Sequence, residues 1–60
     1  MLMIAEVLSV DPVEGVCEVA TESGFVLRDV SWPAGSRVPG TREMVAVSVT
    51  ATSKKIVNLE

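Results

Sequence analysis

The chain has 60 residues, eight of them acidic and five basic, and hydrophobic residues make up 48% of it. This composition excludes the disordered class, which combines low hydrophobicity with high charge. The net charge of −3 also disfavours nucleic acid and anionic membranes as partners, because both draw affinity from clustered cations. We expect a single domain over residues 1–60.

Alternation of apolar and polar residues is typical of half-buried strands and predicts strands nearly everywhere in this chain. The first is expected over residues 3–10, ending at Asp11-Pro12, where proline removes a backbone donor. Glu14-Gly15 complete the connection to a second strand over residues 16–21. Ser23-Gly24 then predict a tight turn, because glycine adopts positive φ without a steric cost.

A third strand is expected over residues 25–30, followed by a loop over 31–40 that contains two prolines and two glycines. The clearest strand is the fourth, where Val45, Val47 and Val49 alternate with Met44, Ala46, Ser48 and Thr50. The fifth is expected over residues 54–59. Five short strands with hairpin turns predict an all-β fold, a small five-stranded barrel of the OB-fold or SH3-like kind.

The residue types on which most catalysis depends are missing or dispersed. The chain has no His and no Tyr, and its acidic residues fall at turns or at alternating strand positions that a solvated face explains. Its single cysteine, Cys17, lies in a strand pattern and is expected to be a small buried residue. We therefore expect no enzyme, no catalytic residues, no cofactor and no metal site.

The aromatic residues are Phe25 and Trp32. Phe25 opens a strand and is expected in the core. Trp32 lies in the loop, where capping one end of the barrel is favoured over presenting a contact to a partner. The opening segment, residues 1–4, is too short for a signal peptide, so we expect a soluble protein of the cytoplasm or of a virion that no signal peptide directs to secretion.

The order of features resembles the small OB-fold modules of bacteriophage tail and baseplate proteins. The resemblance covers about residues 4–59 and rests on the strand before Pro12, the segment after Gly15, Gly24 with the strand 26–30, the loop Trp32-Pro33-Ala34-Gly35 and the strand from Met44. Thr41-Arg42-Glu43-Met44 and Asn58 depart from the pattern, which has a Gly-Asp pair and a closing glycine at these places. The resemblance implies a structural module that assembles with itself and with other virion proteins, without catalytic residues.

Apolar residues on both faces of the last strand suggest that a second subunit covers one of them. The leading hypothesis is a non-catalytic structural module that self-associates into a homo-oligomer and contacts other structural proteins. Its interface candidates are Trp32, Ile56 and Leu59. The alternative is a small cytoplasmic module that binds nucleic acid or a protein ligand, which requires the separated basic residues Arg28, Arg37, Arg42, Lys54 and Lys55 to converge in space.

Overall fold

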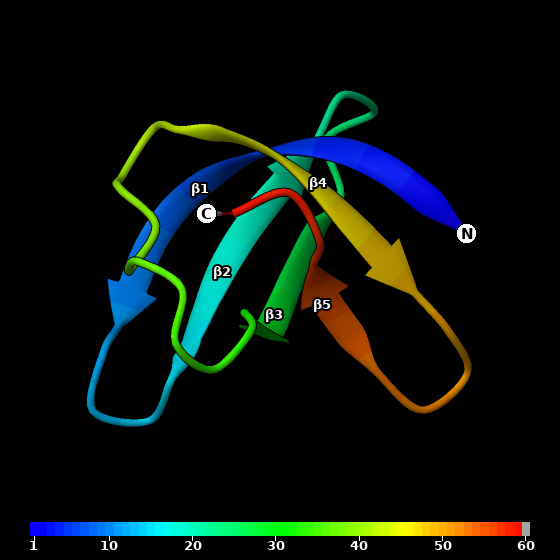
Figure 1. Ribbon diagram of the computed structural model, residues 1–60. Helices are drawn as coiled ribbons and strands as arrows, with labels where there is room; N and C mark the ends of the chain where they lie inside the picture. Colours follow the sequence, from blue (N-terminus) through cyan, green and yellow to red (C-terminus); the bar gives the residue numbers. More distant parts are fainter. Residues whose placement is uncertain (60) are drawn as a thin grey trace.

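The computed structural model describes residues 1–59 and contains five strands and no helix in that range. They are β1 (Leu2–Asp11), β2 (Val16–Thr21), β3 (Val26–Ser31), β4 (Met44–Val49) and β5 (Lys54–Ile56). The strands close into a barrel in the order β1-β2-β3-β5-β4, with β4 returning to β1 (Figure 1). The expectation of a small all-β barrel is confirmed.

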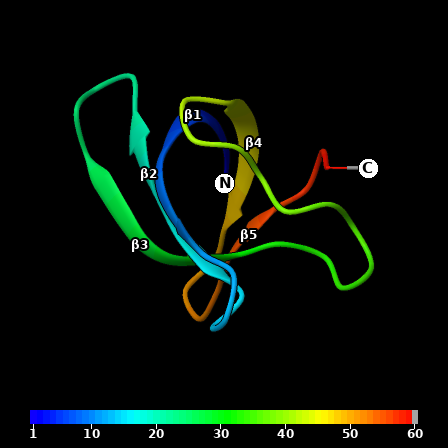
Figure 2. The same ribbon diagram turned by 90° about the vertical axis from the view of Figure 1, so that its left-hand side faces the viewer.

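All strand pairs are antiparallel except β3 and β5, which run parallel. Such a pair needs a crossover, and here the loop 32–43, β4 and the turn 50–53 supply it. In Figure 2 the β2–β3 hairpin leans away from β4 and β5, so the barrel is tighter at one end than at the other.

Turn chemistry explains where the first strands end. A side-chain oxygen of Asp11 accepts hydrogen bonds from the backbone N–H groups of Val13 and Glu14, each 3.1 Å long, and Gly15 takes a φ of 74°. At the next turn Gly24 takes a φ of 91° and donates to the carbonyl of Thr21. Both predicted hairpin turns are confirmed.

The core is made of small and branched side chains that face the barrel interior. Its fully or almost fully buried members are Ala5, Val7, Cys17, Val19, Val30, Val45, Val47 and Ile56. Burial raises the pKa of the Cys17 thiol, and the prediction that this cysteine is buried is confirmed.

The fifth strand is shorter than predicted, because it ends at Ile56 rather than near Leu59. Beyond it the chain still follows β4: the N–H of Val57 donates to the carbonyl of Ala46 over 3.0 Å. The N–H of Ala46, however, donates to the side-chain oxygen of Asn58 and not to a backbone group. A side chain thus takes the place of the next ladder bond and ends the strand.

The long loop is held by a carboxylate. Two nitrogens of the Arg37 guanidinium donate to the two oxygens of Glu43, and the N–H of Gly40 donates to one of the same oxygens over 2.9 Å. These bonds, that of Arg37 first, lower the pKa of Glu43 from 4.5 to about 2. The carbonyl of Glu43 also accepts from the N–H of Val7, so these bonds fix the loop against β1. We call the bonds of the Glu43 carboxylate to Arg37 and Gly40 the clamp.

This clamp predicts a pH dependence of stability. A carboxyl group whose pKa is lower in the folded state stabilises the fold above the unfolded pKa, near 4.5, and this contribution is lost as the pH falls towards 2. Acid unfolding followed by circular dichroism should show that Glu43→Gln loses less stability than the wild type over this interval. Glu14→Gln, at an exposed turn, is the matched control, and its stability should fall with decreasing pH as steeply as that of the wild type. Equal slopes for the wild type and Glu43→Gln would contradict the clamp.

Candidate interaction site

Large apolar side chains are exposed around the first residues of the chain. Residues 1–4 are all apolar, so the alternation of a strand places apolar groups on both faces of β1. Six of these residues, each about half exposed or more, lie at or near the beginnings of β1, β3 and β4. We call them the apolar patch: Met1, Leu2, Ile4, Phe25, Val26 and Met44. Leu2 and Ile4 lie on one face of β1 and Met1 on the other, so the patch has two parts, and exposed apolar surface of this kind marks interaction sites on monomers.

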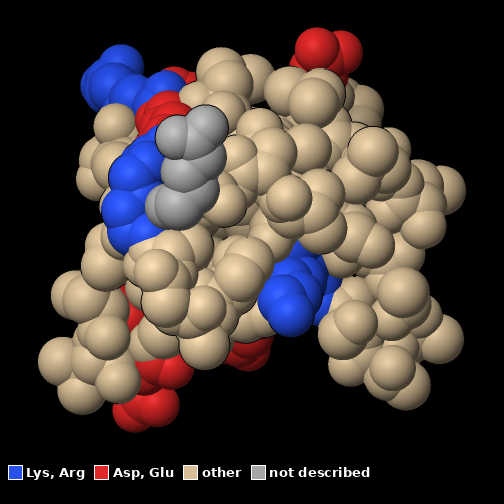
Figure 3. Space-filling model, in the orientation of Figure 1, with Lys and Arg blue, Asp and Glu red and all other residues tan. Residues whose placement is uncertain are grey.

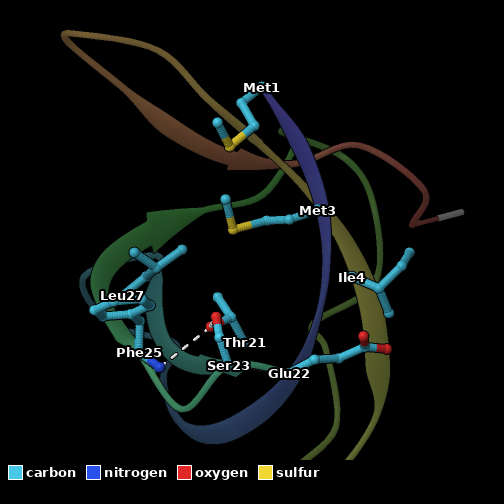
Figure 4. A pocket seen from close by; sticks show the side chains of 8 residues that line it. All are labelled: Met1, Met3, Ile4, Thr21, Glu22, Ser23, Phe25 and Leu27. Atoms are coloured by element: carbon cyan, nitrogen blue, oxygen red, sulfur yellow. Dashed lines mark hydrogen bonds between the residues drawn. The ribbon is translucent and has the colours of Figure 1, made fainter.

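One part of this surface is hollowed into an open groove of about 600 Å³. Its lining residues are Met1, Met3, Ile4, Thr21, Glu22, Ser23, Phe25 and Leu27. Figure 4 shows the side chains of Met1 and Met3 pointing from β1 towards Leu27 and Phe25, while Ile4 points to the other side of β1. The groove therefore has mainly apolar walls, and two methionines can adjust their shape to an occupant.

The groove exists because the barrel is not sealed along the whole of β3. The pairing of β3 with β5 consists of a single register position, Ser31 with Lys55. Before it, β3 has one residue more than β2 between the pairs Leu27–Val19 and Val30–Cys17, and Asp29 takes a φ of 57°. This β-bulge bends β3, so its first half lies apart from β5 and leaves the inner face of β1 open near Met3.

Charges are sparse around the groove. Within the described chain, Glu22 is the lining residue with a charged side chain, and the terminal amine of Met1 donates to the carbonyl of Val49 over 2.8 Å. In Figure 3 the part of the surface over the beginning of β1 is almost entirely uncharged, and basic side chains form separate spots. The site is thus suited to an apolar occupant.

The three residues that the sequence singled out as interface candidates do not gather at this groove. Ile56 is 0% exposed and belongs to the core, so its side chain is not available for a surface contact. Leu59 and Trp32 are half-buried and pack against the core cluster. The outward apolar residue at the end of β5 is instead Val57, which is exposed.

Phe25 was expected in the core, and this prediction is wrong, because its side chain is 69% exposed. Its backbone belongs to the turn: its carbonyl accepts from the N–H of Thr21 and its own N–H donates to the Thr21 hydroxyl over 3.2 Å. The ring consequently lies at the rim of the groove (Figure 4). The signal in the sequence that could have found this site is the run of four apolar residues at the start.

Some of the charged side chains are engaged in ion pairs within the fold. Arg28 lies 3.9 Å from Glu18 and Arg37 is held by Glu43, so a carboxylate accompanies two of the five basic side chains. Among residues 1–59, no group of three potential metal-ligating side chains comes together. The same residues include no helix of the length and apolarity that a transmembrane helix requires.

The fold and the groove define a small five-stranded barrel with an apolar opening between β1 and β3. The chain shows no significant match to a known protein family, to a curated protein or to a solved structure.

Proposed function

We propose that this protein is a non-catalytic assembly module that self-associates through the groove and the apolar patch. The observation that carries the proposal is the exposure of Met1 and Phe25 beside a groove that is open and nearly uncharged. A chain of this size buries only roughly 60% of the surface of its unfolded form. Covering such a patch with a second copy adds the apolar burial that the isolated barrel lacks.

Part of the patch borders the groove and supports a second copy as the occupant. Met1 and Phe25 are 83% and 69% exposed and, at roughly 200 Å² for a fully exposed side chain of this size, offer on the order of 300 Å² beside the groove. Stable protein interfaces bury about 800 Å² on each partner, so the neighbouring surface of β3 must supply the rest.

Two finer features belong to the same proposal. The strand order with a parallel β3–β5 pair favours an OB-type Greek-key barrel over an SH3-like one, in which neighbouring strands are antiparallel. The resemblance to phage tail and baseplate modules implies a virion as the place of assembly. Genes for head or tail proteins beside its own would support this setting, and metabolic neighbours would count against it.

Replacing Phe25 by serine tests the self-association. The wild type should sediment as a dimer or larger species at micromolar concentration, and Phe25→Ser should weaken association by roughly tenfold or more, because it removes an exposed aromatic anchor. Its thermal stability as a monomer should change little. The measurement is sedimentation equilibrium over a concentration series.

Val13→Ser is the matched control for this experiment. Val13 is 93% exposed at the tip of the β1–β2 turn, outside the groove, so its replacement removes apolar surface without touching the site. It should leave association unchanged. A wild type that stays monomeric at these concentrations would refute the proposed function.

A further inference from the structure

The first half of β3 has an edge to which no described strand pairs. Val26 and Leu27 pair with Ala20 and Val19 of β2 on one side, whereas the pairing of β3 with β5 on the other side begins only at Ser31. Residues 26–29 thus present an open strand edge that borders the groove. Such an edge is a template for a further strand.

The hydrogen bonds of the hairpin determine which backbone groups are free. The N–H of Thr21 donates to the carbonyl of Phe25, so this carbonyl points towards β2. In an antiparallel ladder the backbone groups of successive residues point alternately towards the paired strand and away from it. The N–H and C=O of Val26 therefore point away from β2, and those of Arg28, two residues further and before the bulge at Asp29, repeat this direction.

We propose that two copies of the chain pair through their β3 edges about a twofold axis, so that one continuous sheet runs across the dimer. This inference rests on the proposed self-association and names its interface. The free groups fix the register: Val26 of one copy bonds Arg28 of the other, and the two Leu27 residues lie opposite each other. Each pairing of Val26 with Arg28 has two backbone hydrogen bonds, and the twofold axis repeats this pairing, so the interface contains four bonds.

The side chains next to this edge fit such a partner. Leu27 lines the groove together with Phe25, Met1 and Met3, so the facing Leu27 residues would enter an apolar environment. Residues opposite each other without shared hydrogen bonds are the closer pairs of a ladder, which favours contact between the two leucines. The segment 26–29 carries one positive and one negative charge, so an antiparallel copy meets no net repulsion.

Replacing Val26 by proline tests the edge of β3 without removing a hydrogen bond of the barrel itself. Because the Val26 N–H points away from β2, Val26→Pro removes a donor that the barrel itself does not use, and proline is tolerated at edge positions. It should raise the dimer dissociation constant by roughly ten- to a hundredfold through the loss of two symmetry-related bonds. Val26→Thr keeps the N–H and the branched shape, and should dimerise like the wild type.

Sedimentation equilibrium and circular dichroism on these full-length variants distinguish the outcomes. A dimeric wild type with a monomeric, folded Val26→Pro supports the β3 interface, whereas a Val26→Pro dimer of unchanged affinity overturns it and leaves the proposed self-association standing. A monomeric wild type refutes both, and leaves the edge to a strand of another protein.

Hydrogen exchange on the wild type provides a second reading if Val26→Pro does not fold. The amides of Val26 and Arg28 should be protected at high protein concentration and lose protection on dilution. Fast exchange of both amides in a dimer would overturn the β3 interface.

Discussion

Replacing Ile56 by alanine should remove about half of the free energy of unfolding at 25 °C. Ile56 is the one residue of the three-residue strand β5 whose side chain is fully buried, and it lies opposite Val47 in the register of β4. Isoleucine-to-alanine replacements in a core cost about 2–5 kcal/mol. A 60-residue domain has a total stability of only about 3–9 kcal/mol, so the loss is about half of it.

The neighbouring residue is the control for this prediction. Val57 is exposed and holds its place through a backbone bond to Ala46, which Val57→Ala retains. Its replacement should change the free energy of unfolding by no more than about 0.5 kcal/mol. Circular dichroism and urea unfolding measure both variants. If Ile56→Ala kept its stability and lost only self-association, Ile56 would act at an interface and its place in the core would be wrong.

Trp32→Ala should lower the free energy of unfolding by about 2 kcal/mol. Removing a fully buried tryptophan costs about 3–5 kcal/mol, and Trp32 is only half-buried while it packs against the core cluster. It begins the loop that leads to the buried Pro39, so its loss also loosens the loop. With a urea dependence of about 1 kcal/mol/M, the midpoint should shift by about 2 M.

Trp32→Phe retains an apolar aromatic ring and should lose less than half as much stability. Far-ultraviolet circular dichroism follows all three proteins, because both variants lack the single tryptophan that fluorescence would report. Association should be little affected, because Trp32 follows the end of β3 while the groove borders its beginning. A large change in association at unchanged stability would favour the contact role for Trp32 instead.

Local signals determined most of the barrel. Asp11 and Pro12 end β1, and Gly15 and Gly24 take the positive φ values that their turns require. The alternation around Val45 and Val47 placed β4 and its buried face correctly. These features depend on neighbouring residues along the chain, so the sequence alone contains the information for them.

The site was not predictable in the same way. Phe25 and Ile56 are both large apolar residues in strand-like segments, yet one is exposed and the other fully buried. Alternation tells which residues share a face of a strand, but not whether another strand covers that face. For Phe25 the answer depends on how far β3 pairs with β5, which lies far along the chain.

The amino-acid sequence by itself determined a small acidic β protein, the positions of its turns and the buried state of Cys17. Only the tertiary structure decided that the barrel closes through a parallel contact of Ser31 with Lys55. It also decided that the bulge at Asp29 keeps the first half of β3 apart from β5. The physical reason is that strand pairing between distant segments determines which apolar surface remains exposed to solvent, and no local pattern records it.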